Sequence, residues 1–332
     1  MRRLWTYLRR RPTVETGPAV VTVETTTHCN LRCTFCHRTH SPTPERVLPL
    51  DIFRTLIDDP RHRIDTMHLY GMGEPLMDPH LVDRIALCRE RGIQTHIATN
   101  ATLLDERKTT ELLDAGLTAV TFSVDTLRPE VYEDLRRGAN YARTVANILH
   151  FLERRRASKR QPFVFVQMLR TEQTAKEIGA IRHFWRQRGV TAVRVCRDEF
   201  TNRPPHIHDR RHHYTSAGPC PFLWYGPALV RADGGLYPCC SAGLDGEPAA
   251  NLNETSLYDF WTGPMMREIR ETHLAGRRHP VSNCFACQSQ KPIPILASLA
   301  GLADGITARR LGVRAEQWAE TFSWRLTYRE TS

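Results

Sequence analysis

The chain has 332 residues, of which 41% are hydrophobic and 25% are charged; this composition is typical of a folded globular protein and excludes a disordered or fibrous one. The formal net charge of +10 at pH 7 favours an anionic partner such as a phosphate or a carboxylate. No run of about 18 apolar residues occurs, and the basic residues 1–11 lack the apolar core of a signal peptide. We therefore expect a cytoplasmic protein without a membrane partner.

Apolar, β-branched runs alternate with amphipathic stretches over the first two thirds of the chain. We predict strands over residues 19–24, 66–70, 94–99, 119–124, 163–168 and 192–196, and helices over residues 51–58, 81–91, 105–115, 141–156 and 174–188. Regular β/α alternation predicts a parallel sheet with right-handed crossovers. The fold class is therefore α/β, and six repeats predict a partial (β/α)6 TIM-like barrel over residues 19–201.

The pattern changes after residue 201, where Pro, His, Gly and Cys replace the long periodic runs. We predict a small α+β domain over residues 202–295, a C-terminal helical tail over residues 296–332 and a basic N-terminal extension over residues 1–18. The arginine runs are interpreted as solvated helix faces. Because no nucleic-acid recognition motif accompanies them, no nucleic-acid partner is expected.

Three cysteines, Cys29, Cys33 and Cys36, lie directly after the first predicted strand. Ten cysteines in a cytoplasmic chain indicate metal ligation or catalysis rather than disulfides. A zinc ion would need a further ligand, such as a neighbouring histidine, whereas an iron–sulfur cubane held by three thiolates keeps one iron free. The spacing alone leaves both alternatives open.

Polar side chains lie at or just after the ends of the predicted strands. Active sites of parallel sheets form at the carboxyl ends of strands, so these side chains should face one mouth. The candidates are Thr25 to His28, Gly71 to Glu74, Asn100, Ser123, Asp125, Gln167, Arg170, and Arg197 to Glu199.

The spacing Cys29-x3-Cys33-x2-Cys36, followed by Gly71-Met72-Gly73-Glu74-Pro75 after the second strand, resembles the radical S-adenosylmethionine (SAM) superfamily. The resemblance implies that the three thiolates hold a [4Fe-4S] cluster whose free iron chelates SAM. It also implies cleavage of SAM to a 5′-deoxyadenosyl radical, which abstracts hydrogen from a substrate carbon. Each SAM contact that the resemblance implies falls on a strand end or on the cysteine motif: Phe35 near the adenine; Gly71, Gly73 and Glu74 at the amino group; Asn100, Ser123 and Asp125 at the ribose; Gln167 or Arg170 at the nucleoside or carboxylate.

A second cysteine set resembles the auxiliary-cluster domain of the same superfamily, called SPASM. No cysteine follows Cys287, so the resemblance is to the shortened, twitch-type form with one auxiliary [4Fe-4S] cluster. Its implied ligands are Cys220, Cys239, Cys284 and Cys287. A zinc site on the same thiols is the alternative, and Cys240 could replace Cys239.

Two further thiols, Cys196 and Cys240, are candidate hydrogen-atom donors, with a buried apolar thiol as the alternative interpretation of each. Histidines cluster in the segment between the predicted domains and are interpreted as a polar loop, as substrate contacts or as metal ligands: His206, His208, His212 and His213.

The predicted enzyme is a radical SAM oxidoreductase or transferase acting on a carbohydrate, nucleotide-sugar or nucleoside in antibiotic biosynthesis. Oxidation of a carbinol, with the auxiliary cluster as electron acceptor, is the leading hypothesis. Its alternatives are redox-neutral epimerisation or tunicamycin-type carbon–carbon coupling, a peptide maturase, and a non-catalytic iron–sulfur or zinc module. A peptide maturase is disfavoured because only about eighteen residues precede the first strand. The expected partners are an anionic or polyhydroxylated small molecule and an external electron donor such as flavodoxin or ferredoxin.

Overall fold

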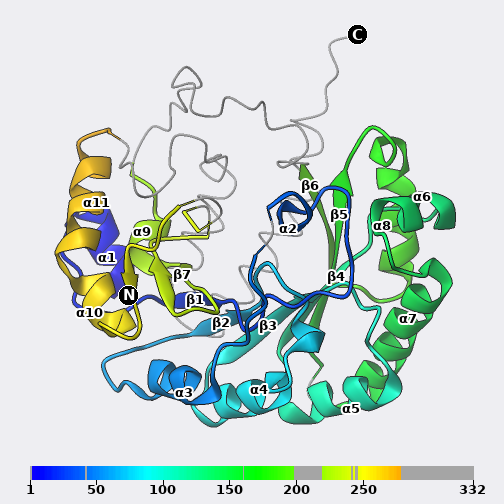
Figure 1. Cartoon of the computed structure of the whole chain (residues 1–332), viewed down its shortest axis with the longest axis horizontal. Helices are drawn as coiled ribbons and strands as arrows, with labels where there is room; N and C mark the ends of the chain where they lie inside the picture. The colour runs from blue at the N-terminus through cyan, green and yellow to red at the C-terminus, as the bar shows by residue number, and fades with distance from the viewer. Residues whose placement is uncertain are drawn as a thin grey trace. The chain divides into compact units, whose positions relative to one another are not determined.

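The structure, a computed structural model, describes residues 2–41, 43–159, 161–197, 219–240, 242–243 and 246–277 (Figure 1). These residues fall into two compact units. The barrel unit contains residues 23–50 and 67–197, and the flanking unit contains residues 2–22, 51–66 and 219–277. The first two strands, β1 (Val20–Val23) and β2 (Thr66–Leu69), are divided between the units after Thr22 and after Thr66.

The barrel unit is a curved parallel sheet with helices on its outer side (Figure 1). Strands β3 (Gln94–Thr99), β4 (Ala119–Ser123), β5 (Phe163–Arg170) and β6 (Ala192–Arg197) pair in this order, all parallel. The helices along the outside are α4 (Leu81–Glu90), α5 (Glu106–Ala115), α7 (Tyr141–Ala157) and α8 (Ile178–Gln187). The predicted α/β fold, an open partial barrel, is thus confirmed.

The alternation of buried and half-buried side chains along a strand indicates which face of the sheet the helices cover. In β5, Val164, Val166 and Met168 are fully buried, whereas Gln167 between them is half-buried. Successive side chains of a strand point to opposite faces. The outer face is therefore apolar and packed against the helices, and the inner face carries the polar residues.

The predicted strands are confirmed to within one or two residues. The helix predicted over residues 174–188 is instead divided into a 3-10 helix, η2 (Ala175–Glu177), and α8. The Glu177 carboxylate at the junction accepts hydrogen bonds from Thr126 Oγ1 at 2.7 Å and Leu127 N at 3.1 Å. Among the described residues before position 198, four helical segments were not predicted: α1 (Arg2–Leu8), α2 (His37–His40), η1 (Pro75–Met77) and α6 (Pro129–Leu135). Helix α3 (Leu50–Asp58) matches its prediction.

The flanking unit combines short antiparallel strands with helices. Strands β7 (Ala228–Val230), β8 (Gly235–Tyr237) and β9 (Ala250–Asn251) pair in this order. Helix α9 (Phe222–Tyr225) precedes them, and α10 (Leu257–Thr262) and α11 (Pro264–Leu274) follow. This unit agrees in class with the predicted α+β domain. The predicted tail over residues 296–332 lies outside the described residues.

The amino-terminal segment, residues 2–16, belongs to the flanking unit. Tyr7 Oη donates to Pro219 O at 3.2 Å, Trp224 Nε1 donates to Arg11 O at 2.7 Å, and Tyr258 Oη donates to Glu15 O at 2.9 Å. The predicted domain bounds remain a prediction. Within the described residues, no helix is long and apolar enough to cross a membrane.

Candidate active site

The three clustered cysteines lie on a loop, the Cys loop (residues 29–36), that follows β1. Backbone hydrogen bonds attach it to the segment after α6: Arg32 N donates to Arg137 O and Thr34 N donates to Leu135 O, each at 3.0 Å. The Thr34 hydroxyl adds a weaker bond to the same Leu135 carbonyl at 3.4 Å. The loop is therefore held at two points by a segment about 100 residues further along the chain.

The thiols of the Cys loop are shielded from solvent. Cys33 is buried and Cys29 and Cys36 are half-buried. Burial raises the pKa of the Cys29 thiol, and it raises the pKa of Cys33 to about 11, against the opposing effect of Arg136. Metal ligands must be deprotonated thiolates, so binding of iron here displaces protons, and a buried site with a nearby cation suits an anionic cluster.

Among the residues that the structure describes, no three side chains of His, Cys, Asp or Glu are arranged around one metal ion. A [4Fe-4S] cluster binds each thiolate through a different iron. The three ligands of such a cluster therefore need not surround a single metal ion.

A glycine loop, residues 71–75, lies against the chain that leads into the Cys loop. A Cβ on Gly73 would clash with the carbonyl oxygen of Thr26 and would lie 2.8 Å from His28 O. Glu74 N donates to His28 O at 2.7 Å, and Met72 N donates to Glu24 Oε1 at 2.9 Å. Only glycine permits this approach of backbone to backbone.

Glu74 points into the protein and is 3% exposed. Its Oε1 accepts hydrogen bonds from Thr99 Oγ1 at 2.6 Å and Leu76 N at 3.1 Å, and its Oε2 accepts one from Asn100 N at 2.8 Å. Burial raises the pKa of this carboxyl. The described contacts of Glu74 join the glycine loop to the end of β3, and the expected contact with the SAM amino group stays a prediction.

Asn100 connects the end of β3 to the Cys loop. Its Nδ2 donates to Asn30 Oδ1 at 3.0 Å, and its Oδ1 accepts from Thr102 N at 2.9 Å. The structure thus brings together the Cys loop, the glycine loop and the third strand, as the sequence motifs predict. Asn30 and Thr99 were not predicted, since nothing in their sequence context distinguishes them from loop and strand residues.

Arg136 contacts both Asp125 and Phe35, and it was not among the predicted site residues. Arg136 Nε donates to Asp125 Oδ2 at 2.6 Å, and its guanidinium carbon lies 5.3 Å from the centroid of the Phe35 ring. Burial acts to lower the pKa of Arg136, but Asp125 and Cys33 outweigh it and the pKa is raised. Arg136 is therefore a permanent buried cation beside the Cys loop.

The remaining barrel candidates lie on the neighbouring strands. Ser123 ends β4 and is the register partner of Gln167, which lies within β5, three residues before its end; both are half-buried. Arg170 ends β5 and is half-buried, and Cys196 pairs in register with Leu169 near the end of β6. Their expected roles as SAM contacts and hydrogen-atom donor stay predictions.

The flanking unit holds the other described cysteines. Cys220 is buried and its amide donates to His273 Nδ1 at 3.5 Å. Cys239 packs against Leu229 and Tyr237, and Cys240 Sγ lies 3.4 Å from Thr22 Oγ1. Cys284 and Cys287 lie outside the described residues, as do the four predicted histidines and residues 198–199.

The inner face of the sheet carries an aromatic and cationic cluster, the inner-face cluster (His68, His96, Thr121, Phe165 and Arg194). The Arg194 guanidinium carbon lies 4.2 Å from the Phe165 ring centroid, and its Nη1 lies 3.5 Å from Thr121 Oγ1. His96 Nε2 lies 2.8 Å from the same hydroxyl. Desolvation by burial and the charge of Arg194 lower the pKa of His68 to about 4, so Arg194 supplies the positive charge of this cluster at neutral pH.

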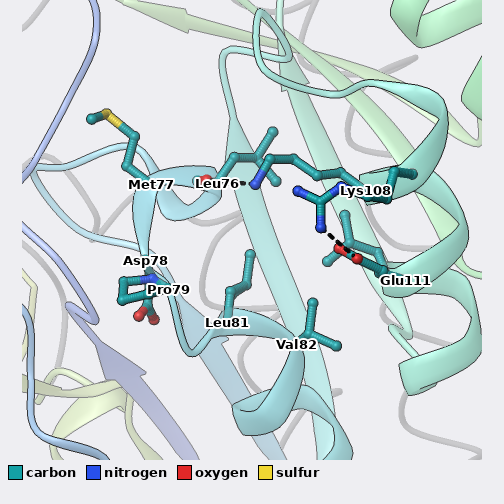
Figure 2. A pocket seen from close by; sticks show the side chains of 10 residues that line it. Leu76, Met77, Asp78, Pro79, Leu81, Val82, Lys108 and Glu111 are labelled. Carbon is teal, nitrogen blue, oxygen red and sulfur yellow. Dashed lines mark hydrogen bonds and ion pairs between the residues drawn. The ribbon is translucent and has the colours of Figure 1, made fainter.

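A separate pocket lies on the outer side of the barrel unit, between η1, α4 and α5 (Figure 2). It has a volume of about 270 Å³. Lys108 Nζ donates to Leu76 O at 3.2 Å, and Arg107 pairs with Glu111 at 2.7 Å. The pocket contains none of the predicted site residues, and Lys108 instead fixes the backbone just after the glycine loop.

The radical SAM superfamily model matches residues 23–184, which contain the Cys loop, the glycine loop and β3 to β5. A second model, an iron–sulfur cluster-binding domain of the SPASM type, matches residues 220–288.

The chain belongs to the radical SAM superfamily.

Curated relatives are similar over part of the chain. A tungsten-containing aldehyde ferredoxin oxidoreductase cofactor-modifying protein of Pyrococcus furiosus is 29% identical over 177 residues, covering 52% of this chain and 49% of that protein. A GTP 3′,8-cyclase of Limosilactobacillus fermentum is 32% identical over 142 residues, which cover 40% of this chain and 42% of that protein. The matched part of the chain thus covers half or less of the length of these two relatives.

Solved structures share the fold. Streptococcus suis SuiB bound to S-adenosylmethionine has a TM-score of 0.61 at 17% identity, covering 80% of this chain and 70% of that chain. The protein anSMEcpe with bound AdoMet has a TM-score of 0.61 at 14% identity, covering 93% and 94%.

A radical SAM domain binds a [4Fe-4S] cluster and SAM, and a SPASM domain binds additional iron–sulfur clusters. The donor set of the Cys loop fits the first cluster: three shielded thiols lie beside a buried cation. When bound, the cluster and SAM supply a carbon-centred radical. The chain's own residues then have to hold the Cys loop in place, exclude water and present a substrate carbon.

Proposed function

We propose that this radical SAM enzyme abstracts hydrogen from a carbon of an anionic carbohydrate, nucleotide-sugar or nucleoside in the biosynthesis of an antibiotic or a related secondary metabolite. The observation that carries the proposal is the inner-face cluster, in which Arg194 supplies a positive charge beside the Phe165 ring and the neutral imidazole of His68. The net charge of +10 supports the same substrate class, because a basic surface attracts anions.

The proposed reaction is the oxidation of a carbinol. Removal of the carbon-bound hydrogen forms a C–H bond on 5′-deoxyadenosine and leaves a carbon radical. Loss of the hydroxyl proton and of one electron then gives the carbonyl. An auxiliary cluster held by Cys220, Cys239, Cys284 and Cys287 would supply the electron acceptor, and an external donor such as flavodoxin or ferredoxin would supply the electron that cleaves SAM.

The test uses matched pairs of deuterated substrates, namely a nucleotide sugar and its uncharged parent sugar. We expect deuterium in 5′-deoxyadenosine with the charged member of a pair, detected by mass spectrometry. For that substrate Arg194→Gln should raise KM roughly 10-fold or more, since a hydrogen bond between charged groups contributes about 1.5–3 kcal/mol. Transfer from the uncharged sugar alone, or an unchanged KM in Arg194→Gln, would contradict the anionic substrate class.

A redox-neutral ring closure or coupling on a nucleotide is the second candidate. It is supported by the relatives named GTP 3′,8-cyclase, whose name gives a nucleotide as substrate. In that case the product keeps the oxidation state of the substrate, because the hydrogen lost to 5′-deoxyadenosine is replaced by one electron and one proton. The auxiliary cluster would then donate an electron to the product radical instead of accepting one. Electron paramagnetic resonance of a single-turnover sample separates the two candidates.

A further inference from the structure

Arg136 belongs to a segment, residues 135–138, that is hydrogen-bonded to the backbone of the Cys loop. The carbonyl groups of Leu135 and Arg137, on either side of Arg136, accept the hydrogen bonds from Thr34 N and Arg32 N. Gly138 ends the segment with a φ of +95°, a conformation that favours glycine. The backbone around Arg136 is therefore fixed relative to the cysteines.

Two adjacent arginines differ in burial. Arg136 is 7% exposed, whereas Arg137 is exposed to solvent. Arg136 is anchored by Asp125, which is 1% exposed and whose other oxygen, Oδ1, accepts a hydrogen bond from Leu169 N in β5 at 2.8 Å. The guanidinium is thus held between the parallel sheet and the Cys loop.

The charge of Arg136 acts directly on the Cys loop. Its guanidinium lies against the ring of Phe35, between Cys33 and Cys36 in sequence. Asp125 accepts from the Nε of this guanidinium and from Leu169 N in β5, so the charge is fixed in place next to the Cys loop. Buried charges are screened by salt much less than exposed ones, so the guanidinium acts on the loop as a fixed positive charge.

We propose that Arg136 raises the reduction potential of the iron–sulfur cluster held by Cys29, Cys33 and Cys36, and that Asp125 is the positioning residue that fixes and partly offsets this charge. Reduction adds one negative charge to a cluster that three thiolates already make electron-rich. A fixed positive charge nearby stabilises the reduced state more than the oxidised state. This inference needs the cluster alone and does not depend on the substrate.

The experiment is a redox titration of the anaerobically reconstituted full-length chain without SAM, followed by electron paramagnetic resonance. The signal that changes when SAM is added afterwards identifies the cluster at the Cys loop. The variants are Arg136→Gln, Arg136→Lys and Asp125→Asn, and Arg137→Gln is the matched control on the same segment. Iron and sulfide content confirms that each variant is loaded.

We expect Arg136→Gln to lower the equilibrium constant for reduction at least 10-fold, which is about 59 mV for a one-electron couple. The reduction potential of Arg136→Lys, which keeps the charge, should lie between those of Arg136→Gln and the wild type. Asp125→Asn should shift the potential upward, and Arg137→Gln should leave it unchanged.

Equal potentials for Arg136→Gln and Arg137→Gln would overturn the proposal. If Arg136→Gln does not bind the cluster, the reduction potential of Asp125→Asn tests the proposal instead. A potential that is unchanged or lower than that of the wild type would also overturn the proposal.

Discussion

Glu74 is a motif residue whose carboxylate is hydrogen-bonded to the protein itself. Sequence comparison with a family motif identifies this glutamate, but only the structure shows three protein donors around its carboxylate. Asn100 and Asp125 are similar, since Asn100 bonds Asn30 and Asp125 bonds Arg136 and Leu169. The positions of these residues followed from strand ends, whereas their partners did not, because hydrogen bonds between loops depend on the tertiary fold.

Replacing Glu74 by Gln tests this structural contribution. The amide offers one acceptor oxygen in place of two, so a buried N–H or hydroxyl loses its partner, and we expect a loss of about 1–3 kcal/mol in the free energy of unfolding. Glu111→Gln is the control, because Glu111 forms a surface pair with Arg107, and such pairs contribute about 0–1 kcal/mol. Urea unfolding followed by circular dichroism measures both, and equal losses would argue against a special role of Glu74.

At the scale of elements, the strands were the most predictable part because their outer faces form continuous apolar runs. Helix α6 and the segment after it were missed, although Pro129 is a common first residue of a helix. This region supplies both backbone acceptors for the Cys loop. A sequence pattern does not indicate such docking, because it involves carbonyl groups that every residue possesses.

The glycine loop gives the prediction for this scale. Gly73→Ala places a methyl group against the carbonyls of Thr26 and His28, and neither neighbour is a flexible side chain. We expect a loss of about 1–3 kcal/mol in stability together with weaker SAM binding, measured by urea unfolding and calorimetry. Gly179→Ala in α8, with nothing within 4 Å of the added atom, should be neutral or stabilise by about 0.5–1 kcal/mol. Similar behaviour of the two variants would show that the close approach at Gly73 is unimportant.

For the whole molecule, the order of strands and the change after residue 201 were visible in the sequence, but the composition of the two units was not. Residues 2–22 and 51–66 belong with residues 219–277, although more than 150 residues of sequence lie between residue 66 and residue 219. Hydrophobic periodicity reports neighbours within an element and contains no signal for such long-range pairing.

The two cysteine sets should be separable. Replacing both Cys220 and Cys239 by Ala should remove about four irons per chain, the content of one cubane, while SAM cleavage by the cluster at the Cys loop continues. Iron analysis and chromatography of 5′-deoxyadenosine measure the two effects. Loss of SAM cleavage in a variant that retains about four irons would show that the sets are not independent.

The hydrogen bonds of the amino-terminal segment constrain the order in which the protein can fold during synthesis. Tyr7, Arg11, Pro12 and Glu15 bond to groups that lie 212 to 258 residues later in the chain. At typical translation rates the first residues wait roughly 10–50 s for these partners. The strands from β3 to β6 pair with neighbours in sequence and can assemble earlier. Strands β3 to β6 can therefore pair before residues 7–15 meet their hydrogen-bond partners.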